Sequence, residues 1–188
     1  MSSIKLTPAE ARRELARRAK LRINPRVVLT DAFPQQIAFI DDPNNLKALW
    51  CTRRAAKSFT AGLYMVYEAL KEPNSNLLFI GLTRESAKAI IWKDVLLQLD
   101  KRYKLNIKFN RSELTATFQN GSIIKVTGVD AEETDMLKLL GRKYRLVCID
   151  EASMYTIDTR TLVYGVLRPA MIDPSSQGAR VIVAVQYA

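Results

Sequence analysis

The sequence predicts an α/β domain whose mostly parallel β-sheet is flanked by helices. Short apolar segments alternate with segments of helical periodicity along most of the 188 residues, which is the pattern of a parallel sheet. Two of the apolar segments, Leu77–Leu82 and Arg145–Asp150, are almost continuous, as expected of strands covered on both faces. Asn120-Gly121 separates two segments of period-two alternation and predicts an antiparallel hairpin.

The first elements follow from their capping residues and apolar faces. Thr7 and Glu10 form a capping box with Pro8 at the first helical position, so a basic helix is expected to begin there. The expected elements in this part are a helix from Pro8 to about Leu21 that Asn24-Pro25 ends, a short helix over Pro34–Asp41, a strand over Leu46–Cys51 and a helix over Lys57–Lys71.

The rest of the chain repeats the alternation. Thr83 is expected to cap a helix, with Glu85 as its capping partner. The expected elements are a strand over Leu77–Leu82, this helix to about Lys101, strands over Ile107–Phe109, Glu113–Gln119 and Ser122–Thr127, a helix near Asp130–Leu139, a strand over Arg145–Asp150, a helix over Thr159–Met171 and a strand over Arg180–Val185. We therefore expect one domain over residues 31–188, preceded by a basic helical arm over residues 1–30.

The composition excludes several kinds of chemistry. The 48% hydrophobic and 26% charged residues are globular values, no apolar run approaches the ~20 residues of a membrane span, and the charged N-terminus differs from a signal peptide. An intracellular protein without a membrane partner is expected. The chain has no histidine, which excludes Ser-His and Cys-His nucleophilic catalysis and histidine-ligated zinc. Cys51 and Cys148 lie in apolar segments and are expected to act as small hydrophobic residues.

The formal net charge of +10 is concentrated at the N-terminus. Residues 1–26 contain eight basic and two acidic residues, a net charge of +6. The charge run fits either a solvated helix face or a surface that contacts nucleic-acid phosphates or an acidic partner. Charge alone does not separate these two interpretations.

A phosphate-binding loop is indicated between the strand Leu46–Cys51 and the helix that follows it. In a Walker A loop, backbone N–H groups and a helix N-terminus bind phosphates, a lysine reaches the β- and γ-phosphates, and Ser or Thr binds Mg²⁺. Lys57 and Ser58 occupy those last two positions, while Cys51 and Ala56 replace the two signature glycines. By pattern alone, an accidental strand-Lys-Ser-helix sequence remains the alternative.

A second motif strengthens this interpretation. The strand Arg145–Asp150 delivers Asp150 and Glu151 at its C-terminal end, where ligands bind in open α/β sheets. Asp150 is expected to hold Mg²⁺ together with Ser58, and Glu151 to orient the attacking water. The spacing from Lys57 leaves room for a strand between the two motifs. This arrangement is typical of the RecA-like (ASCE) P-loop NTPases, with ATP and Mg²⁺ as cofactors.

The motifs resemble those of the N-terminal ATPase domain of phage terminase large subunits, over about residues 30–188. Phe33-Pro34-Gln35-Gln36 is similar to the sequence before the P-loop strand of that family. Arg53-Arg54-Ala55-Ala56-Lys57-Ser58 looks like its arginine-rich Walker A, and Leu140-Gly141-Arg142-Lys143-Tyr144 is similar to a stretch before its Walker B. The Asn-Gly hairpin fits the same layout.

The resemblance implies an ATP-driven motor that packages double-stranded DNA into a procapsid in the cytoplasm of a bacterial host. Implied partners are DNA, the portal protein, the small terminase subunit and other copies of the chain in a ring. The implied ATP-binding residues are Gln35 or Gln36, which read adenine, and Thr52, Arg53, Arg54, Ala55, Ala56, Lys57, Ser58 and Phe59; the implied catalytic residues are Glu151 and an arginine, with Arg142 first and Arg53 or Arg54 next.

Three departures from the family pattern stand out. Ala56 replaces a glycine, and Leu140 stands where many terminases place an arginine. The family's coupling motif is expected near residue 185, where the chain reads Val185-Gln186-Tyr187-Ala188, and the nuclease half is expected to be absent.

Three other interpretations stay open. One is a helicase of the DEAD-like superfamily, which requires a second RecA-like domain. Another is a non-enzymatic nucleic-acid-binding protein with a decayed P-loop, and the third is a truncated gene product that folds without turning over.

Overall fold

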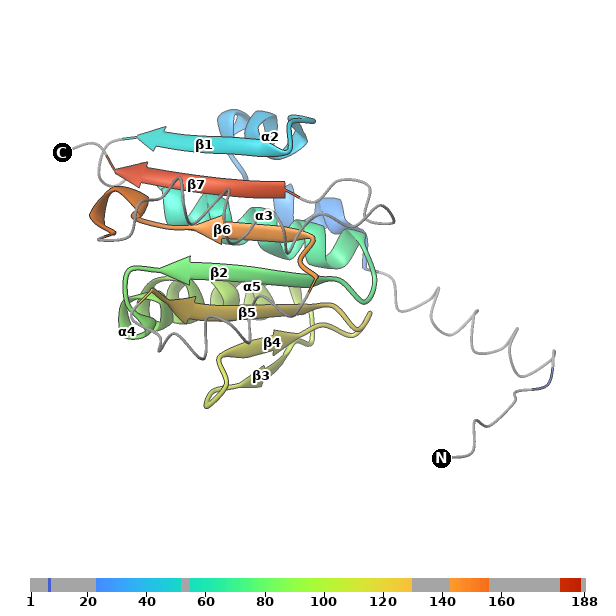
Figure 1. Ribbon diagram of the computed structural model, residues 1–188. Helices are drawn as coiled ribbons and strands as arrows, with labels where there is room; N and C mark the ends of the chain where they lie inside the picture. The colour runs from blue at the N-terminus through green and yellow to red at the C-terminus, as the bar shows by residue number, and fades with distance from the viewer. Residues whose placement is uncertain (1–6, 8–22, 52–54, 130–142, 156–179, 187–188) are drawn as a thin grey trace.

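A seven-stranded sheet forms the centre of the computed structural model, which describes residues 7, 23–51, 55–129, 143–155 and 180–186. The strands are β1 (Leu46–Cys51), β2 (Asn76–Gly81), β3 (Lys108–Asn110), β4 (Thr115–Thr117), β5 (Ile123–Gly128), β6 (Leu146–Ile149) and β7 (Arg180–Gln186). Their order in the sheet is β1-β7-β6-β2-β5-β4-β3, and the first five pair in parallel (Figure 1). The predicted fold class is confirmed.

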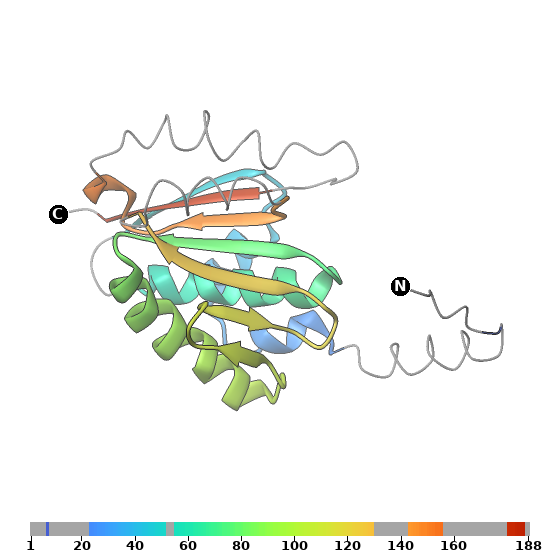
Figure 2. The same ribbon diagram turned by 60° about the horizontal axis from the view of Figure 1, so that its bottom comes forward.

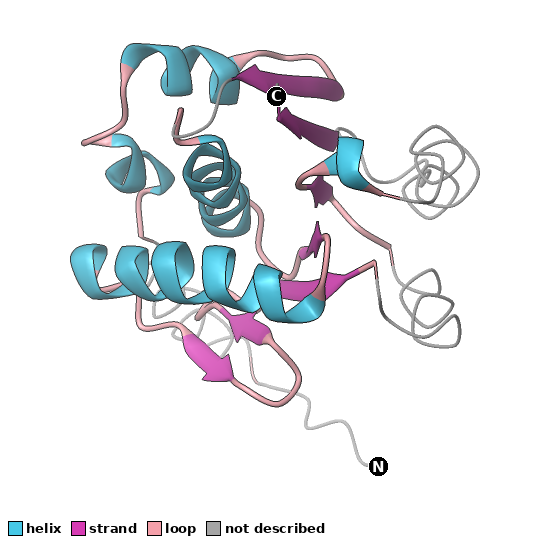
Figure 3. Cartoon of the chain, turned by 90° about the vertical axis from the view of Figure 1, so that its left-hand side faces the viewer, coloured by secondary structure: helices cyan, strands magenta, loops and turns pink. Residues whose placement is uncertain are grey.

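The described helices other than η3 lie on one face of this sheet (Figure 3). They are the 3₁₀ helix η1 (Pro25–Leu29), α2 (Pro34–Asp41), α3 (Lys57–Lys71) and a continuous helical run made of α4 (Arg84–Ala87), the π-helical η2 (Lys88–Leu96) and α5 (Leu97–Tyr103). A second 3₁₀ helix, η3 (Ala152–Met154), follows β6. Among the described residues, no helix is both long and apolar enough to cross a membrane.

The helix α3 is the most deeply buried element of this layer. Its residues from Thr60 to Ala69 are all buried, and they contact the sheet and the neighbouring helices. Gly62 allows the run α4–η2–α5 to approach closely, because a Cβ at this position would lie 2.5 Å from Val95 Cγ1 and 2.7 Å from Ile91 Cδ1. The close packing fixes α3 between the second helical run and the sheet.

The predicted hairpin is present as β4 and β5 (Figure 2). Gly121 has a φ of 86°, a backbone conformation that favours glycine, and its N–H bonds to Phe118 O at 3.0 Å. Because β5 pairs in parallel with β2, the hairpin extends the sheet at one edge and carries β3 as the last strand.

Most of the expected boundaries agree with the structure, and three details differ. Pro25 was expected to end a helix, but it begins η1, whose Val28 and Leu29 are buried in the core. The core therefore includes residues from the range assigned to the arm. The capping partner of Thr83 is Ser86 rather than Glu85, because Ser86 is the residue at the third helical position. The expected helices at Pro8–Leu21, Asp130–Leu139 and Thr159–Met171 lie outside the described residues.

Candidate functional site

The two predicted motifs lie at the same edge of the sheet. β1 and β6 both pair in parallel with β7, so their C-terminal ends point the same way, with β7 between them. The loop after β1 leads to Lys57 and Ser58 at the start of α3, and the loop after β6 contains Asp150 and Glu151. The expectation of a strand between the motifs is confirmed, and carboxyl ends of parallel strands are where ligands bind in such sheets.

A hydrogen bond joins the two motifs directly. Ser58 Oγ donates to Asp150 Oδ2 at 2.7 Å, across 92 residues of sequence. The other carboxylate oxygen of Asp150 accepts from the Glu151 backbone N–H at 3.0 Å, and the Asp150 backbone N–H bonds to Ile80 O at 2.9 Å. Asp150 is only 3% exposed, so these contacts hold its carboxylate in one position.

This pair of oxygen groups fits a magnesium ion. Mg²⁺ prefers oxygen ligands and is held in proteins by one or two carboxylates together with substrate phosphates and water. Ser58 and Asp150 provide a hydroxyl and a carboxylate within 2.7 Å of each other. The described residues contain no cluster of three acidic, cysteine or histidine side chains that could hold a metal without such additional ligands.

The Lys57 ammonium group lies at the base of the loop. Its Nζ donates to Cys51 O, the last carbonyl of β1, at 3.1 Å. The side chain is half-buried, and Ser58 is the next residue of the same helical turn. A cation and the N-terminus of α3 therefore lie beside the Ser58–Asp150 pair, an arrangement that attracts anions.

Two non-glycine residues at this edge have left-handed backbone conformations. Ala56, the N-cap of α3, has φ 55° and ψ 28°, and Glu151, the N-cap of η3, has φ 54° and ψ 34°. A residue with a Cβ in this region costs about 1–2 kcal/mol. Ala56 holds the position of a signature glycine, so the turn keeps a geometry that suits glycine although the residue is alanine.

The Glu151 side chain is positioned differently from that of Asp150. It is partly exposed, and among the described residues no hydrogen bond or ion pair engages its carboxylate. The left-handed turn at Glu151 redirects the chain from β6 into η3. The structure therefore provides one fixed carboxylate and one carboxylate free to meet a ligand from the described part of the site.

The two candidate adenine readers have unequal surroundings. Gln36 is 7% exposed, and its amide oxygen accepts from the Phe33 N–H at 2.9 Å while its Nε2 donates to Thr60 Oγ1 at 2.8 Å. Gln35 is exposed at the start of α2. Thr60 also donates to Ala56 O at 2.8 Å, so Gln36 supports the turn that precedes Lys57.

Sequence reasoning missed Thr60 and Tyr155. Thr60 lies one turn after the N-cap Ala56, a spacing that could have drawn attention to it. Tyr155 OH donates to Ile80 O at 3.0 Å, next to the Asp150 backbone contact, and no sequence signal marks it. Burial raises the pKa of the Tyr155 phenol well above its ordinary value, and the Asp150 charge raises it further.

The cysteines behave as small hydrophobic residues in part. Both are free. Cys148 is buried on β6, and this burial raises the pKa of its thiol, with the charge of Asp150 adding to the effect. Cys51 is only half-buried at the end of β1, so the expectation of a buried position holds for Cys148 and is wrong for Cys51.

The remaining predicted residues divide into two groups. Ala55 and Phe59 are exposed beside Lys57 and Ser58. Thr52, Arg53, Arg54 and Arg142 lie outside the described residues.

Comparison with known proteins extends this picture through structure alone. No protein-family model matches the sequence, and no curated protein is significantly similar to it. The fold and the paired motifs at one sheet edge define a domain of the P-loop NTPase fold.

The solved structures that match are large terminases of phages. The Thermus phage P74-26 large terminase ATPase domain superposes with a TM-score of 0.65 at 19% identity, over 89% of this chain and 72% of that one. The HK97 bacteriophage large terminase gives 0.62 at 12% identity, over 84% and 33%. A large terminase from a thermophilic bacteriophage gives 0.60 at 16% identity, over 88% and 38%. The chain therefore has the fold of large terminase ATPase domains and spans little more than a third of the two longer proteins.

Proposed function

We propose that this chain binds Mg-ATP and hydrolyses it as the ATPase domain of a terminase large subunit. The observation that carries the proposal is the hydrogen bond between Ser58 and Asp150, which joins the two motifs at one sheet edge. The large terminase of the thermophilic bacteriophage, which shares this fold, has been crystallised with ADP and with ATP-gamma-S. That fold and this pair of residues together favour a nucleotide over other phosphate-bearing ligands.

Each residue of the site has a role in this proposal. Lys57 binds the β- and γ-phosphates, because its ammonium group lies beside the N-terminus of α3. Ser58 and Asp150 hold Mg²⁺, which neutralises charge on the phosphates when it is bound. Glu151 accepts a hydrogen bond from the attacking water and orients it toward the γ-phosphate, since its carboxylate is available to the site.

The arginine and the adenine reader are part of the same proposal. Arg142, Arg53 or Arg54 stabilises the negative charge that develops in the transition state. Gln35 is favoured over Gln36 for reading the adenine base, because the Gln36 amide is already bonded to Phe33 and Thr60.

The biological role rests on the fold of the relatives. We propose that ATP hydrolysis drives double-stranded DNA into a procapsid in the host cytoplasm, with the portal protein, the small terminase subunit and further copies of the chain as partners. The basic residues 1–26 are proposed to contact DNA phosphates or an acidic partner.

One observation favours a second candidate, a nucleic-acid-binding domain that no longer turns over ATP. Ala56 has a Cβ in a left-handed turn where phosphate approaches the backbone. In this alternative the domain keeps the fold and loses hydrolysis.

Equilibrium binding separates the two candidates. A fluorescent ATP analogue is titrated with the purified chain in Mg²⁺ and in EDTA, beside the variant Ser58→Ala. The proposal predicts saturable binding that is strengthened by Mg²⁺, with most of this effect lost in Ser58→Ala. Absence of binding in both buffers supports the second candidate.

A further inference from the structure

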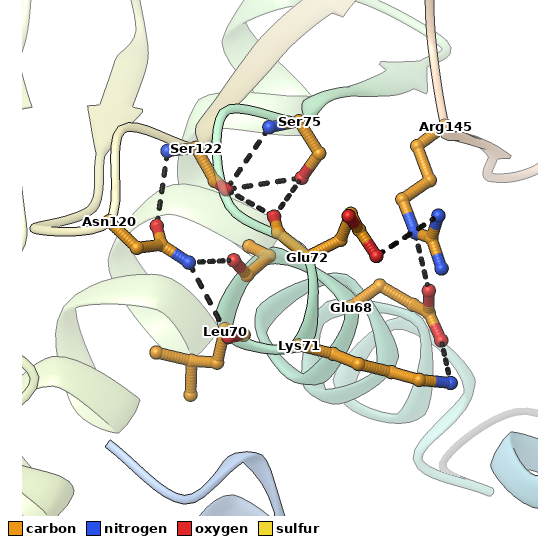
Figure 4. A network of polar contacts seen from close by, with 9 residues as sticks. Glu68, Leu70, Lys71, Glu72, Ser75, Asn120, Ser122 and Arg145 are labelled. Carbon is orange, nitrogen blue, oxygen red and sulfur yellow. Dashed lines mark hydrogen bonds and ion pairs between the residues drawn. The ribbon is translucent and has the colours of Figure 1, made fainter. Parts of the chain in front are cut away.

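Two polar contacts join α3 to β6, one toward each end of the pair of elements. At the C-terminal end of β6, Ser58 donates to Asp150. At its N-terminal end, Arg145 Nε donates to Glu68 Oε2 at 2.9 Å (Figure 4). The helix that begins with Lys57 and the strand that leads to Asp150 are thus connected twice.

The spacing of these contacts is the same on both elements. Ser58 and Glu68 are ten residues apart, which is about 15 Å of α-helix. Arg145 and Asp150 are five residues apart, which is about 16–17 Å of extended strand. Both contacts therefore form together only when α3 has one axial position along β6.

The Glu68–Arg145 pair is buried and charged. The Glu68 side chain is 1% exposed and that of Arg145 is 18% exposed. Lys71 lies 3.7 Å from Glu68, and Glu72 lies 3.8 Å from Arg145. Leaving either charge of such a pair alone in the interior is costly, so the pair strongly disfavours positions of α3 in which the two groups separate.

The apolar contacts of α3 restrain a different property. Burial of apolar side chains is non-directional, so it holds α3 against the sheet more strongly than it fixes the helix along its axis. A charge-assisted hydrogen bond depends on distance and angle. Of the contacts described here, Glu68–Arg145 and Ser58–Asp150 are those that set the position of α3 along β6.

We propose that Glu68 and Arg145 are positioning residues for the nucleotide site. By fixing α3 along β6, they hold Ser58 and Asp150 at the separation that Mg²⁺ requires, although they lie about 15 Å away. This inference rests on the proposed function, because the ion that the site holds is the Mg²⁺ of Mg-ATP.

The variant Glu68→Gln tests the inference, since it keeps the side-chain shape and removes the charge. The Mg²⁺ concentration that gives half-maximal binding of a fluorescent ADP analogue is expected to rise at least fivefold, while binding in EDTA is unchanged. A role in stability alone would lower the thermal midpoint and leave the Mg²⁺ titration as in the unmodified chain. That result overturns the proposal.

Asn120→Ala is the matched control. Asn120 Nδ2 donates to Ala69 O at 2.7 Å and so contacts the same end of α3, but it joins the helix to the β4–β5 hairpin rather than to β6. We expect reduced stability with an unchanged Mg²⁺ titration. An equal shift in both variants would mean that any loosening of this end of α3 weakens the site, and it would contradict the assignment to the pair.

Two further measurements keep the inference testable if Glu68→Gln does not fold or the chain binds no nucleotide. The double variant Glu68→Leu with Arg145→Leu removes both buried charges and is expected to fold, with the same rise in the Mg²⁺ requirement. Urea unfolding without nucleotide of Ser58→Ala, the Leu double variant and their combination tests coupling directly. Non-additive losses of stability support a shared axial position even if nucleotide binding fails, whereas additive losses contradict it.

Discussion

The side-chain amide of Gln36 donates a hydrogen bond to Thr60 Oγ1 at 2.8 Å and joins the first turn of α2 to the first turn of α3. Thr60 in turn donates to Ala56 O, the carbonyl of the residue before Lys57. The glutamine predicted as a possible base reader is thus part of the support beneath the phosphate-binding turn. Its neighbour Gln35 is the one whose side chain is exposed.

Substitution of the two glutamines is expected to have separate effects. Gln36→Ala removes two buried hydrogen bonds and should lower the free energy of unfolding by about 1–2 kcal/mol. Gln35→Ala should change it by less than about 0.5 kcal/mol, because the side chain is exposed, and should reduce the preference for ATP over GTP. Urea unfolding and competition binding measure the two effects. A lost preference in Gln36→Ala alone would assign base reading to Gln36.

The left-handed turn at Ala56 predicts a gain from glycine. Ala56→Gly relieves the Cβ strain at φ 55°, partly offset by the greater freedom of the unfolded chain. We expect a net gain of about 0.5 kcal/mol in the free energy of unfolding and tighter binding of ATP. The control is Ala55→Gly, at an adjacent exposed position where φ is not positive. Equal effects of the two substitutions would show that the turn geometry is not the cause.

A buried lysine stabilises the end of α2. Lys47 is 5% exposed on β1, and its Nζ donates to Phe39 O at 2.6 Å and to Ile40 O at 3.3 Å. The ammonium also lies 4.7 Å from the Tyr64 ring centroid. Lys47→Met should lower the free energy of unfolding by about 2 kcal/mol, because these are hydrogen bonds from a charged donor.

The exposed Lys101 on α5 provides the comparison. Lys101→Met is expected to leave the denaturation midpoint nearly unchanged. If Lys47→Met is equally neutral, the contacts at the end of α2 do not contribute to stability.

The two thiols should react at different rates. Burial and the Asp150 charge raise the pKa of Cys148, so its reactive thiolate is scarce at about pH 8 in the folded chain. Cys51 is half-buried, and its carbonyl accepts from Lys57. We expect one thiol to react readily with a disulfide reagent in the native chain and both after unfolding, with Mg-ATP slowing the first. Mass spectrometry after digestion identifies the site, and faster labelling of Cys148 would contradict this order.

Several elements could be predicted because their determinants are local. The strand β1 and the helices α2 and α3 match the expected boundaries, since each is delimited by a proline, a polar turn or a change of periodicity. The π-helical stretch Lys88–Leu96 was expected as ordinary helix. No residue marks it, and it forms where the run packs closely on α3 around Gly62.

The candidate site shows the same division. The pattern of strand and acidic pair predicted that Ser58 and Asp150 would lie together, because strand order follows from the fold class. The buried Glu68–Arg145 pair was not predicted. A glutamate on a helix and an arginine before a strand are ordinary surface residues in a sequence, and only their meeting across 77 residues makes them informative.

ATP turnover by the unmodified chain, Glu151→Gln and Asp150→Asn, measured with and without double-stranded DNA, tests the central claim most directly. The account predicts that the chain hydrolyses Mg-ATP and that Glu151→Gln binds nucleotide normally with turnover reduced at least ~100-fold, since only the water-orienting group is lost. Asp150→Asn should lose Mg²⁺-dependent binding as well, because Asp150 contacts Ser58. Turnover in Glu151→Gln equal to that of the unmodified chain would contradict the assignment of this sheet edge as the ATPase site.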